Sequence, residues 1–177
     1  MRELTDKTGH LGRAGQLAVM AELLARGWNV AIPEVDVGDD VFVAKDDGTR
    51  LTRVQVKTAT PVDVGGAAVA TFLIPPEQLM KAEEVPLVYV FAVPTDARWR
   101  FVVVARRDLS VARADMEASP RAGQPGRPPS RSGSAVSLAL RFEATGVSGW
   151  GRSFAMWESD WSAFPVLRRA VTPDARA

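Results

Sequence analysis

The sequence contains no cysteine, which excludes disulfide bonds, cysteine-ligated zinc and cysteine nucleophiles together. It contains one histidine, His10, and no nucleophile motif accompanies it, so nothing indicates a Ser-His-Asp arrangement. We expect His10 to be an ordinary polar residue near the start of the first helix. The alternative is that His10 and Arg13 contact a phosphate there, because a helix N-terminus attracts anions.

The chain also lacks an excess of charge of either sign. It has 22 Lys and Arg residues against 21 Asp and Glu residues, a net charge of +1, so electrostatic attraction to a partner must be local. The longest notable apolar run, residues 87–93, is far shorter than the ~20 residues that span a bilayer. The N-terminus shows no apolar segment typical of a secretory signal. We therefore expect a cytoplasmic protein that does not contact a membrane.

The composition, 46% hydrophobic and 24% charged, is that of a soluble globular protein, and 177 residues suit one domain. We predict a core over residues 1–118 and a flexible loop rich in Pro, Gly, Ser and Arg over 119–134. A strand and a Trp-rich segment over 135–177 should pack on the same domain. The loop could be a solvated insert, or its arginines could follow a nucleic-acid backbone; they are Arg121, Arg127 and Arg131.

Hydrophobic periodicity and element order predict a mixed α/β domain with a central sheet. Apolar residues at helical spacing predict a first helix over 11–26, closed by Gly27. An Asp-Gly pair between two β-rich runs predicts a hairpin that joins strands at 40–44 and 50–58. The other predicted elements are strands at 28–32, 69–74, 86–94, 100–107 and 135–144, and helices at 75–84 and 107–119.

The predicted hairpin determines which residues face each other. If residues 47–48 form the centre of a two-residue turn, paired residue numbers sum to 95, and Asp40 lies opposite Gln55. Lys57 follows Gln55 along the same row, because side chains alternate between the two faces of a strand. By the same rule, Asp39 points the other way.

A carboxylate, an amide and an ammonium this close together suit metal-assisted hydrolysis of a phosphodiester. Asp40 and the carbonyl oxygens of the Gln55 side chain and the Val56 backbone are hard ligands for Mg²⁺ or Mn²⁺. The metal would polarise the phosphate and lower the pKa of an attacking water, and Lys57 would hold that water or stabilise negative charge. The alternative is an exposed Asp–Lys pair on a solvated sheet face, which contributes little to stability.

Three short motifs follow one another in this part of the chain. They are Gly12-Arg13-Ala14-Gly15-Gln16 in the first helix, Gly38-Asp39-Asp40-Val41 at a strand start, and Gln55-Val56-Lys57 on the next strand. Their order and spacing resemble those of the PD-(D/E)xK nuclease superfamily, which has the restriction-endonuclease-like fold. The similarity covers about residues 9–109. It implies an α/β core in α-β-β-β-α-β order, with a central mixed sheet flanked by helices. It also implies a catalytic set made of Asp40, Gln55, Lys57 and Gln16.

The chain departs from the usual family pattern at two positions. Gln16 stands where the helix motif usually has Glu, and Gln55 stands at the second acidic position. Gln-x-Lys is a known variant among active members, including homing endonucleases of this fold. Asp40 is then the only motif carboxylate, so the resemblance implies low affinity for Mg²⁺ or Mn²⁺. Asp36 or Asp39 could supply a second charge, although the hairpin register places neither beside Asp40.

The Trp-rich end predicts a loop and a short helix. Its tryptophans could stack on bases, but Trp157 and Trp161 are four residues apart and match one helix face. That spacing favours core packing or a dimer seam for them, and Trp150 precedes both.

Three hypotheses for the function follow. The first is a metal-dependent DNA endonuclease, with Arg13, His10 and Arg53 as candidate nucleic-acid contacts and with a homodimer left open. The second keeps the fold as a catalytically degraded module that binds nucleic acid or a protein partner, which the two glutamines favour. The third is an interaction module unrelated to nucleic acid, which the near-zero net charge and the Trp-rich end support.

Overall fold

The computed structural model of the protein describes residues 3–34, 38–44, 51–80, 85–95, 98–118 and 135–164, with side chains from residue 9 onward. The predicted turn at 47–48 and the predicted flexible loop at 119–134 lie outside the described residues. Within the described residues, no helix is long and apolar enough to cross a membrane.

The chain begins with helix α1 (Glu3–Ala25), which starts earlier than the predicted residue 11. Its C-terminus forms as predicted. Gly27 has a φ of 84°, its N–H donates to the Leu24 carbonyl at 2.8 Å, and the N–H of Trp28 donates to the Leu23 carbonyl at 3.1 Å. These two bonds form a Schellman motif, which favours glycine because one residue must adopt a positive φ.

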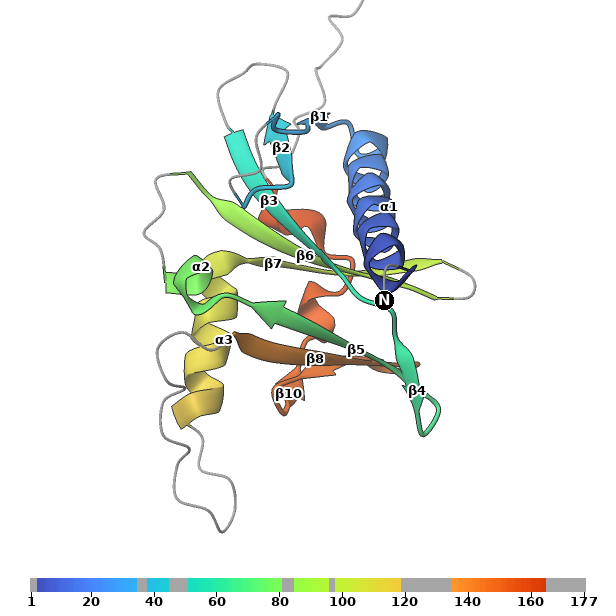
Figure 1. Ribbon diagram of the computed structural model, residues 1–177. Coiled ribbons are helices and arrows are strands. Elements are labelled where there is room, and N and C mark those ends of the chain that lie inside the picture. Colours follow the sequence, from blue (N-terminus) through green and yellow to red (C-terminus); the bar gives the residue numbers. More distant parts are fainter. Residues whose placement is uncertain are drawn as a thin grey trace, which may run out of the picture.

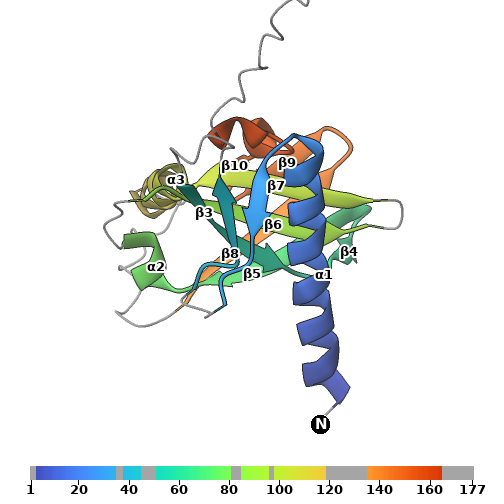
Figure 2. The same cartoon turned by 90° about the horizontal axis from the view of Figure 1, so that it is seen from above.

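The first sheet has five strands: β1 (Asn29–Ala31), β2 (Val41–Ala44), β3 (Leu51–Thr58), β6 (Leu87–Pro94) and β7 (Trp99–Ala105). They lie side by side in the order β1-β2-β3-β6-β7 (Figure 1). All neighbours are antiparallel except β3 and β6, which are parallel. The β2–β3 register pairs Val41 with Val54, so paired numbers sum to 95 as predicted. Helix α1 lies against β1, β3 and β6 on one face of this sheet (Figure 2).

A second sheet, antiparallel throughout, packs on the other face of the first sheet. In spatial order its strands are β10 (Arg152–Ser153), β9 (Gly146–Gly149), β8 (Val136–Glu143), β5 (Ala67–Ile74) and β4 (Val62–Val64). One hydrophobic cluster lies between the sheets, where the rings of Phe72 and Phe91 are 4.9 Å apart. Another lies between α1 and the first sheet. The domain therefore has three layers, a helix and two sheets.

Two further helices, α2 (Pro76–Met80) and α3 (Arg106–Ala118), pack against each other beside the sheets (Figure 1). Leu79 and Leu109 join the cluster between the sheets. The predicted class, α/β with a central mixed sheet, is confirmed. Five strands rather than three lie between α1 and α2, because β4 and β5 belong to the second sheet.

The Trp-rich end forms two 3₁₀ turns, η1 (Ala155–Trp157) and η2 (Trp161–Ala163), instead of one short helix. The Trp157 ring lies 4.8 Å from that of Phe154, on the cluster between the sheets. The Trp161 ring lies 5.6 Å from that of Phe101, in the α1 cluster. The interpretation that both share one helix face is wrong, because the chain pairs with β7 between the two turns. Core packing is nevertheless their environment.

Candidate functional site

Asp40 stands immediately before β2, where β3 continues beyond its neighbour. The N–H of Arg53 donates to the Pro86 carbonyl on the β6 side of β3, so the N–H of Val56 points to the β2 side. No residue of β2 is opposite Val56, and the Asp40 Oδ2 accepts this N–H at 2.7 Å. The carboxylate therefore takes the place of a strand partner.

Gln55 lies beside this carboxylate and is only 7% exposed. Its Nε2 donates to the same oxygen of Asp40, so the structure brings these two residues together. Its other amide atom, Oε1, is buried and accepts no hydrogen bond from a described residue. The site thus holds an amide oxygen with unused acceptor capacity next to its carboxylate.

Gly38 and Gln78 border the Oε1 side of the Gln55 amide. A Cβ built on Gly38 would lie 4.0 Å from Gln55 Oε1 and 3.5 Å from Gln78 Nε2, and the φ of 91° at Gly38 favours glycine. The Tyr89 hydroxyl donates to Gln78 Oε1 at 3.4 Å, and Tyr89 pairs with Gln55 in the β3–β6 ladder. Sequence reasoning missed Gln78, because it belongs to α2 and no motif marks it.

Gln16 reaches the site from α1. Its Nε2 donates to the backbone carbonyl of Asp40, and its Oε1 accepts from Arg13 Nη1 at 2.7 Å. Both ends of the Gln16 amide are therefore engaged. Both glutamines at the usual acidic positions of the motif donate to Asp40.

Lys57 stands two residues beyond Gln55, on the same face of β3 and opposite Phe91 of β6. It is half-buried. Among the described residues, no hydrogen bond or ion pair engages its ammonium group.

Arg53 and Asp39 form an ion pair beside the site, with 3.4 Å between Nη1 and Oδ2. Arg53 also donates to the Val85 carbonyl at 3.2 Å, and Asp39 is buried. The expectation that Asp39 points away from the row of Arg53 and Gln55 is wrong, because residues 38–40 precede β2 and alternation holds only within a strand. These contacts favour a structural role for Arg53, and its contact with nucleic acid stays a prediction.

His10 and Arg13 lie on the exposed surface of α1. The position predicted for His10, near the helix start, is wrong because α1 begins at Glu3. Only the first four N–H groups of a helix lack an internal partner, so the helix terminus cannot bind an anion at either residue. A phosphate contact by these side chains stays a prediction.

No family model matches the sequence, and no curated protein matches it. Among solved structures, the bacterial homing endonuclease I-Ssp6803I is similar, with a TM-score of 0.50, 17% sequence identity and coverage of 88% of this chain and 90% of that chain. The chain has a nuclease-like α/β fold. At this identity the similarity shows the fold alone.

The donor atoms at the site determine whether this nuclease-like fold could hold a metal ion. The described residues contain no group of three or more His, Asp or Glu side chains suited to a metal, and Asp36 lies outside them. The oxygen set nevertheless fits a weakly held Mg²⁺ or Mn²⁺: the Asp40 carboxylate, the Gln55 Oε1 and the Val56 carbonyl. Because Gln55 turns its nitrogen toward Asp40, its amide would have to reverse to act as a ligand.

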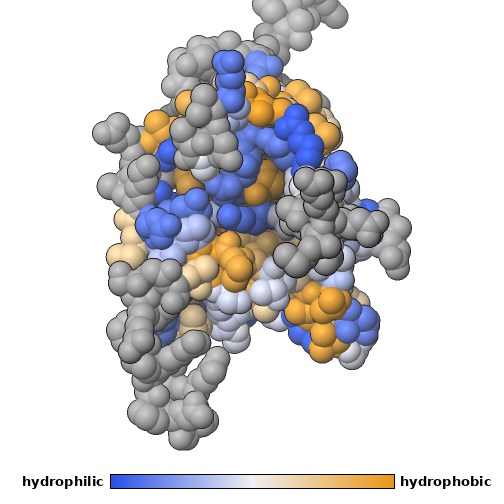
Figure 3. All heavy atoms as spheres, in the orientation of Figure 1, coloured by the Kyte–Doolittle hydropathy of each residue, from blue (hydrophilic) through white to orange (hydrophobic). Residues whose placement is uncertain are grey.

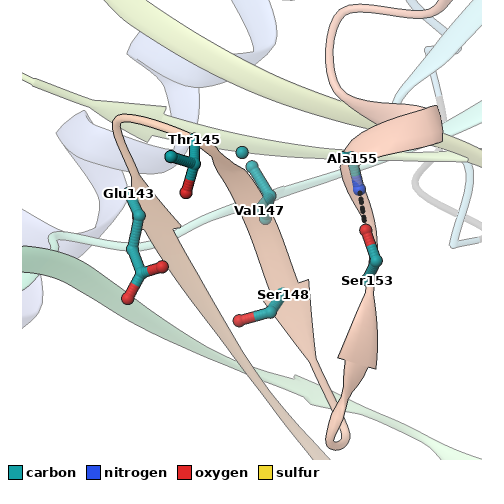
Figure 4. Close-up of a pocket in the computed structure, with 7 residues that line it drawn as sticks. Glu143, Thr145, Val147, Ser148, Ser153 and Ala155 are labelled. Atoms are coloured by element: carbon teal, nitrogen blue, oxygen red, sulfur yellow. Dashed lines mark hydrogen bonds between the residues drawn. The ribbon is translucent and has the colours of Figure 1, made fainter.

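Other surface features add nothing to this site. Figure 3 shows hydrophilic residues across the middle of the face that carries β3, and a hydrophobic surface on the β4 hairpin, where Val62 and Val64 are exposed. A pocket of about 220 Å³ lies at the β8–β9 turn (Figure 4), where Ser153 Oγ accepts from the Ala155 N–H at 3.2 Å. Its lining includes Glu143 and no cation, so it does not suit a phosphate.

Proposed function

We propose that the protein is a metal-dependent DNA endonuclease of the PD-(D/E)xK type, in its Gln-x-Lys form, that hydrolyses phosphodiester bonds. The observation that carries the proposal is the contact of the Asp40 carboxylate with both the Gln55 side chain and the Val56 backbone. Gln16 joins them from α1, and Lys57 stands in the same row as Gln55. Short motifs from three separate segments thus meet at one place, and the nuclease-like fold supports the proposal.

Each residue of the set has a distinct role in this proposal. Asp40, the Gln55 side-chain oxygen and the Val56 backbone carbonyl would hold Mg²⁺ or Mn²⁺, which would polarise the phosphate and activate a water. Gln16 holds the Asp40 backbone in place, because its side-chain Nε2 donates to the backbone carbonyl oxygen of Asp40. Lys57 presents a cation to the negative charge that develops on the phosphate in the transition state. With one carboxylate, the affinity for the metal is low.

DNA is the proposed partner, because the similar solved structure is an endonuclease by name. The proposal places the protein in the cytoplasm, as the sequence suggests, and leaves a homodimer open.

A second candidate function keeps the fold and drops the chemistry. In this reading the protein is a degraded nuclease module that binds nucleic acid or a protein partner. The observation that favours it is that the Asp40 carboxylate accepts hydrogen bonds from the Gln55 amide and the Val56 N–H, as a purely structural carboxylate would.

Cleavage of supercoiled plasmid in Mn²⁺ and calorimetric Mn²⁺ titration separate the two candidates. The variant is Asp40→Asn, which keeps an oxygen for the Val56 N–H but removes the charge. The matched control is Asp63→Asn, because Asp63 is exposed and, among the described residues, accepts only from the turn N–H of Gly66. The nuclease proposal requires wild type and the control to bind Mn²⁺ and nick DNA, while Asp40→Asn does neither.

The other outcomes favour the alternatives. Salt-dependent DNA binding with no Mn²⁺ binding and no cleavage by wild type would favour the degraded module. Absence of DNA binding as well would favour an interaction module unrelated to nucleic acid.

A further inference from the structure

Helix α1 makes its tightest approach to the first sheet at Gly15. A Cβ built on this buried glycine would lie 2.0 Å from the Oγ1 of Thr58, 2.9 Å from its Cγ2 and 3.0 Å from its Cβ. Rotation of the Thr58 side chain could move the first two atoms but not the third. Gly12, one turn earlier on the same helix, has no atom within 4 Å of such a Cβ. Of these two helix glycines, only Gly15 therefore requires the absence of a side chain.

Each residue of this contact is a direct sequence neighbour of a residue of the proposed site. Gly15 precedes Gln16, whose amide donates to the Asp40 carbonyl, and Thr58 follows Lys57 at the end of β3. Ordinary contact begins at 3.4 Å, so a methyl group at position 15 would move the helix and strand apart by about 0.4 Å if Thr58 rotates away and by about 1.4 Å if it keeps its rotamer. A hydrogen bond loses its good geometry toward the upper end of that range.

The Thr58 hydroxyl does not explain the contact by hydrogen bonding. Its Oγ1 is buried and has no hydrogen-bond partner among the described residues. Thr58 therefore contributes a packing contact rather than a polar interaction. Its side chain packs against the backbone of α1 in the space left by the missing side chain of Gly15.

We propose that Gly15 and Thr58 form a spacer that sets the distance between α1 and β3, so that Gln16 reaches Asp40. Gly15 is then a positioning residue, and its importance for cleavage rests on the proposed function. It acts through Gln16 on Asp40 and touches neither substrate nor metal. The mechanical part of the inference, the link from Gly15 to the Gln16 amide, holds whether or not the protein cleaves DNA.

The first comparison is Gly15→Ala against Gly12→Ala, which make the same change one turn apart in α1. Alanine is the better helix former, so Gly12→Ala should raise the melting temperature by about 2–4 °C. Gly15→Ala should lower it, because the added methyl meets Thr58. In ¹⁵N NMR of the protein without DNA, the side-chain amide signal of Gln16 should move toward the position of an exposed glutamine in Gly15→Ala. It should stay unchanged in Gly12→Ala.

The second comparison adds Thr58→Ala, which removes the two nearest atoms and leaves the Cβ at 3.0 Å. Thr58→Ala alone should leave the Gln16 signal in place. Combined with Gly15→Ala, it should restore most of the melting temperature and return the Gln16 signal toward its wild-type position. The double variant also keeps the test valid if Gly15→Ala alone fails to fold.

Cleavage kinetics supply the functional readout. A misplacement of about 1 Å can cost roughly 10²-fold in rate, so kcat should fall by that order in Gly15→Ala with little change in KM for DNA, and should recover in the double variant. An unmoved Gln16 signal in Gly15→Ala, or a double variant no better than the single one, would overturn the spacer. The Gln16 signal could move in Gly15→Ala and return in the double variant while the wild-type protein neither binds metal nor cleaves DNA. That result would support the spacer and overturn the nuclease proposal.

Discussion

Asp40 accepts a hydrogen bond from each of the two glutamines that stand at the usual acidic positions of the motif. An amide can donate in this way and an ionised carboxylate cannot. Gln16 also accepts from Arg13, so it uses both its donor and its acceptor. The two glutamines are therefore matched to the hydrogen-bonding needs of Asp40, and a glutamate at either position would face an oxygen without a proton to share.

At this scale, we expect Gln55→Glu to lower the stability of the metal-free protein and to raise its affinity for metal. The change removes a hydrogen bond to a charged group, worth about 1.5–3 kcal/mol, and adds repulsion from Asp40. The added charge also attracts a divalent ion, so Mn²⁺ should bind about 10-fold more tightly, or ~1.4 kcal/mol. Melting curves and calorimetric titration measure the two effects.

Gln78→Glu is the matched control for that prediction. Gln78 uses its oxygen to accept from the Tyr89 hydroxyl, and a glutamate can still accept there, so the metal-free protein should lose less stability. Equal Mn²⁺ affinity in wild type and in Gln55→Glu would show that Gln55 does not surround a metal. The nuclease proposal would then rest on the fold alone.

Lys57 leads to a second prediction for a single residue. Because no described residue engages its ammonium, Lys57→Ala should reduce kcat by about 10²–10³ while DNA binding and the melting temperature stay near wild type. Plasmid cleavage, a binding titration and a melting curve on one preparation measure all three. Arg107→Ala, which removes an exposed cation of α3, is the control. A large loss of thermal stability in Lys57→Ala would instead assign Lys57 a structural role.

At the scale of elements, Arg53 links three segments that the site needs. It belongs to β3, pairs with Asp39 in the segment before β2, and donates to the Val85 carbonyl before β6. Arg53→Met would leave the buried Asp39 carboxylate without its cation, so the free energy of unfolding should fall by about 3 kcal/mol. Urea denaturation measures this loss.

An exposed ion pair provides the comparison for Arg53→Met. Arg141 pairs with Glu143, and both side chains are well exposed, so Arg141→Met should cost less than about 1 kcal/mol. If Arg53→Met left stability unchanged and weakened DNA binding, the nucleic-acid role predicted for Arg53 would replace the structural one.

The sequence predicts the elements of the site better than their surroundings. The Asp-Gly signal predicts the β2–β3 register that the structure has, and that register brings Asp40 close to Gln55. The second sheet could not be predicted, because alternation in β5 and β8 shows that one face is buried but not against which sheet. Gln78 and the close approach of Gly15 to Thr58 depend on tertiary packing, which local pattern does not encode.

At the scale of the whole molecule, more than half of the arginines whose side chains the structure describes are paired with acids. Six of these arginines form ion pairs with acidic side chains: Arg26, Arg53, Arg100, Arg113, Arg141 and Arg152. Near the site, Arg13 and Lys57 are the described cations without an acidic partner. If these two cations make the phosphate contacts, DNA affinity depends weakly on salt, with a slope of log K against log[salt] of about −2.

Binding titrations between low and moderate salt measure this slope. A much steeper slope would mean that further cations contact the phosphates. Changing the arginines of the segment 119–134 to serine would then test them, and a return to the shallow slope would assign the additional contacts to that segment.

The contact between the Asp40 carboxylate and the Val56 N–H also opposes self-association of the protein through the edge of β3. β3 extends past β2, and an unpaired N–H on an exposed strand edge is a template onto which another chain can add a strand. The negative charge that is proposed to hold a metal covers that template. Removing the side chain with Asp40→Ala would expose the edge and favour aggregation, whereas asparagine keeps it covered. A soluble, inactive protein for crystallisation with DNA is therefore better made with asparagine at this position.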